Sequence, residues 1–171
     1  MNESENKIPK NVDAEEKVLA QCLADGSSDF FDSIAHKLRP EDFYLYNHNL
    51  IFSSVSSLAQ RGESLSEISL MEELKRSSVF EDVGGMEMIL HLMERNTSLL
   101  DAHNCVNVVK EKSNLRNMIR TFKVALEKAE DESQSPEVIR GDVERNLLDL
   151  ETTAGFDMTI GSAIDELQTE F

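Results

Sequence analysis

The stretch that decides the fold is SLLDAHNCVNVVKEKSNLRNMIRTFKVALEKAED, residues 98–131. It opens with Ser98 and Asp101, which are spaced as a helix-capping pair, and it runs to Asp131 without a glycine or a proline. A helix of this length spans roughly 50 Å at 1.5 Å per residue, whereas a compact domain of the preceding hundred residues has a radius of gyration of about 13 Å. We therefore expect one long helix that protrudes from a compact domain.

A turn and a second helix follow the long helix. The segment DESQSPE places Ser135 as a cap before Pro136, and proline suits the first position of a helix. From Ile139 to Leu150 an apolar residue recurs every three or four positions, so this helix is expected to return antiparallel to the first. Two helices bury only one side well, and we therefore expect the hairpin to pair with another copy of itself.

The residues before the long helix show the apolar period of about five short helices. Glycines and Pro40 separate them, and the expected caps are Asp13 with Glu16, Asn47, and Ser66. No stretch alternates apolar and polar residues for long enough to predict a strand. The sequence therefore predicts an all-α fold, with a compact orthogonal bundle of about five short helices, a protruding antiparallel helical hairpin and a C-terminal linker helix.

A short amphipathic pattern follows Gly155. Ile160, Ile164, Leu167 and Phe171 recur at four, three and four residues, which is typical of a helix with one apolar face. This segment is expected either to dock on a partner or to fold back on the hairpin.

Composition and charge restrict the classes of function. The formal net charge is −16, so the average surface repels phosphate backbones and little direct DNA binding is expected. Cys22 and Cys105 do not form a disulfide framework, which is typical of a reducing compartment. The N-terminus lacks the apolar region of a signal peptide and no run of about 18 apolar residues occurs, so we expect a cytoplasmic protein with no membrane segment.

A search for catalytic chemistry is negative. The four histidines show no spacing that brings two ligands to one helical face, and neither a Cys-x-x-Cys pair nor a glycine-rich phosphate-binding motif occurs. Neighbouring acids such as Glu15 with Glu16, and Glu72 with Glu73, are interpreted as solvated helix faces in so acidic a chain. We therefore expect no catalytic, cofactor-binding or metal-binding residues, and no enzymatic activity in this chain.

The segment EDFYLYNHNLIF, residues 41–52, places His48 between two asparagines and among aromatic residues. It is either a chemical site with His48 as ligand or base, or the entry to a core helix. The apolar period that follows favours the core helix, with Phe43 and Phe52 packed inside and Asn47 as the cap. In that interpretation His48 is a hydrogen-bonded structural residue.

A basic strip is expected on the long helix. Its members fall within an arc of roughly 80° at about 100° per residue. The strip is either a surface for nucleic acid or an acidic partner, or a flank of the apolar stripe that pairs with acids such as Glu144 and Asp149 on the returning helix. It consists of Lys112, Arg116, Arg120 and Lys123.

Four blocks of residues stand in one order along the chain: Ala14, Glu15 and Leu19; Phe43, Tyr44, His48, Ile51 and Phe52; Gly84 and Gly85; and Val109, Glu111, Lys112 and Arg116. In this order they resemble the N-terminal domain of DnaB-type replicative DNA helicases over about residues 9–151. The tail is similar to the linker that leads to the motor domain in that family. The match is looser around the hairpin entry, because Met88 replaces the usual tyrosine, Thr97 a common proline and Asp101 an asparagine.

The resemblance implies a scaffold and not a catalyst. Such domains form the collar of a ring helicase, in which hairpins associate head to head into dimers and three dimers close a hexameric ring. The collar receives a DnaG-type primase and, in some systems, a helicase loader, and the linker helix docks on the motor domain of the neighbouring subunit. ATP and Mg²⁺ would belong to the motor domain, so no cofactor is expected in this chain. The alternative is a free-standing adaptor, homologous to this domain, that regulates a helicase or a primase.

The expected division of the chain is a flexible tail at 1–10, a globular helical subdomain at 11–97, an oligomerisation hairpin at 98–151 and a linker with a docking helix at 152–171. The residues expected to carry self-association are Leu115, Ile119, Phe122, Leu126, Ile139, Val143 and Leu147. Those expected to dock on a motor domain are Ile160, Ile164, Leu167 and Phe171. Those expected to hold the fold are Phe43, His48, Ile51, Phe52, Gly84 and Gly85.

Overall fold

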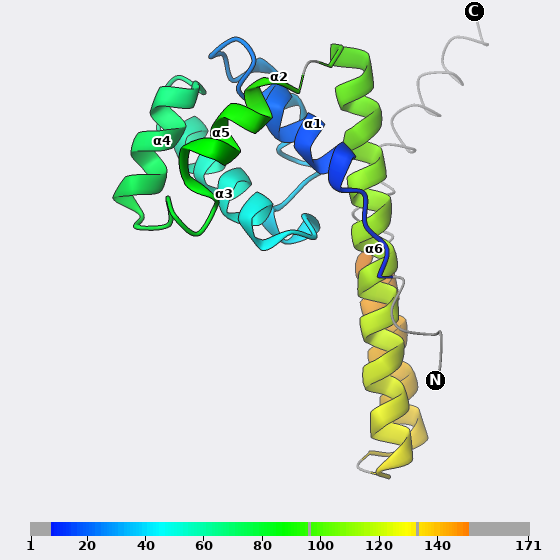
Figure 1. The fold of residues 1–171 in the computed structure, drawn as a ribbon. Helices are drawn as coiled ribbons and strands as arrows, with labels where there is room; N and C mark the ends of the chain where they lie inside the picture. Colours follow the sequence, from blue (N-terminus) through cyan, green and yellow to red (C-terminus); the bar gives the residue numbers. More distant parts are fainter. Residues whose placement is uncertain (1–7, 96, 133, 151–171) are drawn as a thin grey trace, which may run out of the picture. The chain divides into compact units, whose positions relative to one another are not determined.

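The computed structural model describes residues 8–95, 97–132 and 134–150, and within these ranges it contains helices and no strand (Figure 1). The prediction of an all-α fold is therefore confirmed. No helix in the described ranges is long and apolar enough to cross a membrane. In chain order the elements are α1 (Val12–Cys22), α2 (Asp29–Ile34), the 3₁₀ helix η1 (Pro40–Asp42), α3 (Tyr46–Gln60), α4 (Glu67–Arg76), α5 (Gly85–Met93) and α6 (Leu99–Glu130), followed by a helix over residues 136–150.

The chain packs as two compact units, unit 1 (Met1–Ser113) and unit 2 (Asn114–Phe171). The border falls inside α6, because Ala102, Val109 and Ser113 of that helix are buried within unit 1. The first part of α6 is thus a core helix of the globular unit, and its remainder belongs to the hairpin. This border lies further along the chain than the domain limit expected at residue 98. That expectation depends on where the helix begins, and the start of a helix does not show which part of it is packed in the core.

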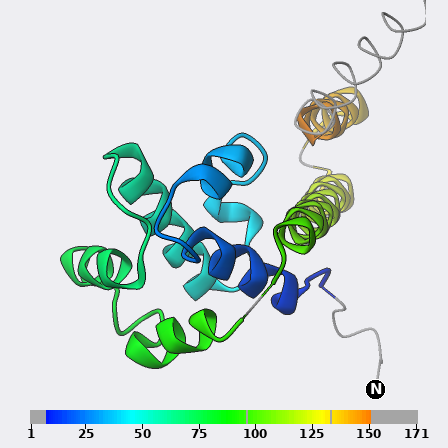
Figure 2. The same cartoon turned by 90° about the horizontal axis from the view of Figure 1, so that it is seen from above.

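The core of unit 1 surrounds α1 and α3, and the short helices cross one another at steep angles (Figures 1 and 2). Leu19 of α1 and Phe52 of α3 are fully buried. The Phe52 ring lies against Phe31, with centroids 5.6 Å apart, and against Phe43, with centroids 4.8 Å apart. These aromatic contacts join α2 and the end of η1 to α3, and they account for much of the buried apolar surface at this point.

Asn11, Ser66 and Ser98 cap helices in unit 1, and the first of these caps differs from the expectation. Asn11 caps α1, because its Oδ1 accepts a hydrogen bond from the backbone N–H of Ala14 at 3.0 Å. The prediction of Asp13 as the cap is wrong, since Asp13 lies within the first turn and its carboxylate forms an ion pair one turn further along α1. Ser66 caps α4 as predicted, accepting from the backbone N–H of Ser69 at 3.2 Å.

The turn before α5 requires glycine. Gly84 has φ of +100° and Gly85 has φ of +59°, in the left-handed region that residues with a Cβ rarely adopt. A Cβ on Gly84 would also lie 3.3 Å from the Cβ of Met88. The two glycines therefore set the direction in which α5 leaves the preceding turn.

Unit 2 contains an antiparallel helical hairpin, formed by the end of α6 and the helix at residues 136–150 (Figure 2). Lys128 donates to Asp142 across the hairpin, with Nζ 3.0 Å from Oδ2. This hydrogen bond lowers the pKa of the Asp142 carboxyl below its ordinary value. Ala125 and Val143 are half-buried and line a small cavity of about 80 Å³ between the helices.

Candidate functional site

The hairpin of unit 2 carries an exposed apolar stripe, which we call the outer stripe. Its residues follow one another at four, three and four positions on α6 and therefore fall within an arc of about 60°. Their side chains are between 37% and 58% exposed. The outer stripe consists of Leu115, Ile119, Phe122 and Leu126.

The other residues expected to carry self-association lie on the second helix of the hairpin, and two of them face inward. Ile139 and Val143 line the cavity between the helices together with Thr121 and Ala125 of α6. Leu147 follows Val143 by one turn and is half-buried. The structure thus separates the expected residues into an outer stripe on α6 and an inner set that closes the hairpin on itself.

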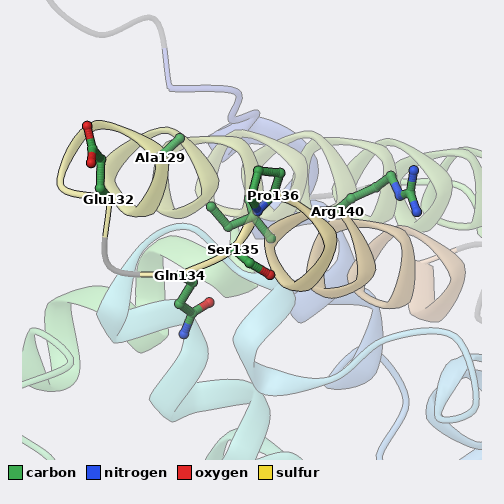
Figure 3. Close-up of a pocket in the computed structure, with 7 residues that line it drawn as sticks. Ala129, Glu132, Gln134, Ser135, Pro136 and Arg140 are labelled. Carbon is green, nitrogen blue, oxygen red and sulfur yellow. The ribbon is translucent and has the colours of Figure 1, made fainter.

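The tip of the hairpin has a shallow hollow of about 630 Å³ that is open to solvent (Figure 3). The side chains of Glu132, Gln134 and Arg140 spread away from one another around it, while Pro136 lies between the two helices. Because these polar groups do not converge on a common point, the hollow offers no constellation for acid–base or nucleophilic chemistry.

The basic strip makes contacts along α6 itself. Lys112 lies 3.0 Å from Glu111, and Arg120 donates to Asn117 at 3.1 Å, so both bond to neighbours on their own helix. Glu144, which was expected to meet the strip, instead lies 3.7 Å from Arg140 on its own helix. The strip therefore flanks the outer stripe along α6, and Glu144 does not neutralise it.

A buried carboxylate and a buried imidazole join α1 to α3. Glu15 and His48 are both almost completely buried, and Oε2 of Glu15 lies 2.8 Å from Nδ1 of His48. The same carboxylate accepts from the backbone N–H of Tyr44 at 2.7 Å and from that of Leu45 at 3.4 Å. Glu15 of α1 thus holds the two backbone N–H groups that come just before the first residue of α3.

Asn47 was expected to cap α3, and this prediction is wrong. The helix begins at Tyr46, so Asn47 lies inside the first turn, where its Oδ1 accepts from the N–H of His48 at 3.0 Å. The contacts at the start of α3 were missed because their carboxylate comes from Glu15, 29 to 33 residues earlier in the chain. The family pattern offered a signal, since Glu15 and His48 both belong to its matching blocks.

Asp42 forms a second buried polar contact, at the point where α6 leaves the core of unit 1. Its carboxylate accepts from Ser113 Oγ at 2.6 Å, from Lys110 Nζ at 3.1 Å and from the backbone N–H of Arg39 at 2.8 Å. Sequence reasoning missed this contact, because Asp42 and Ser113 are 71 residues apart. The contact fixes η1 against the last buried turn of α6.

Two further acids that were interpreted as solvated are buried and paired. Glu16 lies with Oε1 3.1 Å from His91 Nε2 and with Oε2 2.5 Å from Arg95 Nη2. Glu73 lies with Oε2 2.7 Å from Arg61 Nη2 and also pairs with Arg76. The interpretation of solvated faces is therefore wrong for Glu15, Glu16 and Glu73, whereas Glu72 is exposed as expected.

Within the described ranges no three metal-ligating side chains gather in one place. The two thiols lie apart, with Cys22 buried in the core and Cys105 half-buried on α6. Burial raises the pKa of both thiols. The residues expected to dock on a motor domain, which run from Ile160 to Phe171, lie outside the described residues.

Comparison with known proteins points to one family. Residues 7–111 match the family model described as DnaB-like helicase N terminal domain. The chain is 31% identical over 118 residues to the replicative DNA helicase DnaB of Geobacillus stearothermophilus, which covers 69% of this chain and 26% of that helicase. It is 29% identical over 113 residues to the replicative DNA helicase DnaC of Bacillus subtilis, covering 66% of this chain and 24% of that protein.

The fold agrees with this match. A crystal structure of the N-terminal domain of DnaB helicase from Mycobacterium tuberculosis superposes with a TM-score of 0.74 at 23% identity, covering 82% of this chain and 98% of that one. The chain spans about a quarter of the length of the curated relatives it matches, and the family model that it matches is that of an N-terminal domain. The chain therefore belongs to the family of DnaB-like helicase N-terminal domains.

Proposed function

We propose that this chain acts as the N-terminal collar domain of a replicative DNA helicase and that its hairpin pairs with a second copy of itself. The outer stripe of unit 2 carries this proposal. Its four side chains stay exposed, whereas Ile139 and Val143 of the second helix face α6. Two copies that meet through the same stripe would remove it from water on both, as in a two-fold dimer.

The family supports the wider setting of the proposal. The relatives are replicative DNA helicases, so the process we propose is DNA replication in the cytoplasm. Three hairpin dimers would form a hexameric ring, and the collar would bind a DnaG-type primase and a helicase loader. Residues 152–171 would dock on the motor domain of a neighbouring subunit, where ATP and Mg²⁺ would be bound.

A matched pair of leucines tests self-association. Leu126 lies on the outer stripe and is 58% exposed, while Leu148 lies on the second helix and is 59% exposed. Both leucines are replaced separately by glutamate, and the mass of the full chain is measured by light scattering over a concentration series. Circular dichroism checks that both variants keep their helix content.

We expect the wild type and Leu148→Glu to form a dimer or a larger oligomer, and Leu126→Glu to be monomeric, because its charge would be buried without a partner. A wild type that remains monomeric at every concentration would show that the hairpin does not drive assembly of this chain. An equal loss of mass in both variants would show that the outer stripe is not the contact surface.

A further inference from the structure

Unit 1 exposes a second apolar stripe, which lies on α5. Met86, Leu90 and Met93 follow one another at four and three residues, and their side chains are between 45% and 53% exposed. The opposite side of α5 is also apolar, since Ile89 and Leu92 are buried in the core of unit 1. A helix that is apolar on both faces but covered on only one leaves a surface that suits a partner.

A groove runs beside this α5 stripe. It has a volume of about 490 Å³ and lies between the start of α3, the Gly84 turn and α5. Leu90 belongs both to the stripe and to the groove, so the two form one continuous surface. The groove is lined by Asn47, Val83, Gly84, Glu87, Met88, Leu90, His91 and Glu94.

The charge of this surface is negative. Glu87 and Glu94 stand two turns apart on the same side of α5 and are exposed, and neither has an ion-pair partner among the described residues. The neighbouring Arg95 and His91 are already engaged, because both contact Glu16 of α1. An occupant of the groove therefore gains from positive charge next to its apolar face.

The tail of this chain does not have that charge. Residues 152–171 contain four acidic residues and neither lysine nor arginine, so their approach would bring like charges together. The apolar spacing of the tail is that of an amphipathic helix, but its net charge is negative, as is the charge of the groove.

We propose that α5 and the groove beside it form a docking site for a basic amphipathic helix of another protein. The apolar side chains of that helix pack on Met86, Leu90 and Met93, and its lysines or arginines pair with Glu87 and Glu94. Methionine side chains adapt to differently shaped partners, and this mode is that of a helix bound in a groove. The site lies within unit 1 and does not depend on self-association through the outer stripe.

The test uses a fluorescein-labelled helical peptide of about five turns. The peptide has leucine at every third or fourth position with lysines beside the leucines, and its binding to the full chain is followed by fluorescence anisotropy. The protein variants are Leu90→Asp and the double variant Glu87→Lys with Glu94→Lys. Matched controls on α4 are Ile68→Asp, where the isoleucine is 59% exposed, and Glu72→Lys.

We expect Leu90→Asp and the double variant each to weaken binding by at least about tenfold, while both α4 controls bind as the wild type does. The double variant is expected to bind better than the wild type to a second peptide in which glutamate replaces every lysine. Leu126→Glu is expected to bind the basic peptide as the wild type does. This result would show that peptide binding does not depend on the outer stripe of the hairpin.

Three outcomes would overturn the proposal. In the first, a scrambled peptide of the same composition binds as tightly, so that only net charge matters. In the second, Leu90→Asp and Ile68→Asp weaken binding equally. In the third, Leu90→Asp lowers the mass of the chain in light scattering, which would make the occupant a second copy of this chain.

Discussion

Replacing Glu15 by alanine should destabilise the protein more than any change at an exposed acid. The carboxylate lies in the core between α1 and α3 and accepts from the His48 ring and from the backbone N–H groups of Tyr44 and Leu45. Alanine removes this acceptor from three donors at once. It also leaves a fully buried imidazole with no partner for Nδ1, and the other ring nitrogen, Nε2, already has no partner among the described residues.

The magnitude follows from these contacts. Loss of an ordinary hydrogen bond to a backbone N–H group costs about 1 kcal/mol. An unsatisfied buried polar group costs about 1–3 kcal/mol, and this applies to the His48 ring. We therefore expect Glu15→Ala to lower the free energy of unfolding by about 3 kcal/mol. Glu15→Gln keeps an oxygen for the Tyr44 amide, so its expected cost is about half as large.

The assay is equilibrium unfolding in urea followed by circular dichroism, with Glu72→Ala as the control, because Glu72 is an exposed helical acid. The control should stay within about 0.5 kcal/mol of the wild type. A double-mutant cycle of Glu15→Ala with His48→Ala should give a coupling energy of about 1–3 kcal/mol, because the two side chains contact each other directly. Either a cost for Glu15→Ala no larger than that of Glu72→Ala, or a coupling energy near zero, would refute the reasoning.

Three further predictions concern other polar groups. Asp42→Asn should lower the free energy of unfolding in urea by about 2 kcal/mol, because it removes a charged acceptor from three donors; a change below about 0.5 kcal/mol would contradict this. Because Lys128 lowers the pKa of Asp142, the stability from this pair is present above about pH 4 and is lost as the pH falls through the lowered pKa. In a carboxyl NMR titration Lys128→Gln should therefore raise the Asp142 pKa towards about 3.9, and an unchanged pKa would count against the hairpin contact. In native protein at pH 8, Ellman's reagent should label Cys105 slowly and Cys22 only after unfolding, since Cys22 is buried in the core; rapid labelling of both thiols would disagree with that packing.

Much of the helical architecture could be predicted from local signals. The stretch after Ser98 without glycine or proline is α6, and the apolar period from Ile139 to Leu150 lies within the helix at residues 136–150. Ser66 caps α4 because its hydroxyl meets an amide three residues later. These features depend on residues three or four positions apart, so the sequence pattern is enough to predict them.

The candidate site could be predicted only in part. The apolar spacing of Leu115 and Phe122 on α6 is a local property, and the structure shows these residues on one exposed face. The inward direction of Ile139 and Val143 depends on where the second helix lies against α6, which the spacing within one helix does not define. The α5 stripe was missed for a related reason, since the pattern does not tell which of two apolar faces the core will cover.

By itself the sequence determined the helical fold class, the hairpin and the family resemblance. Helix period, turn residues and motifs each depend on residues that are close together in the sequence. Only the tertiary structure decided that Glu15 and Asp42 are buried, that Glu15 holds the backbone before α3, and that α6 passes from core helix to hairpin near Ser113. A carboxylate can be buried only where donors from distant segments reach it, since an unpaired buried charge is too costly to remain. Those donors lie up to 71 residues away along the chain, so packing determines the outcome and local composition does not.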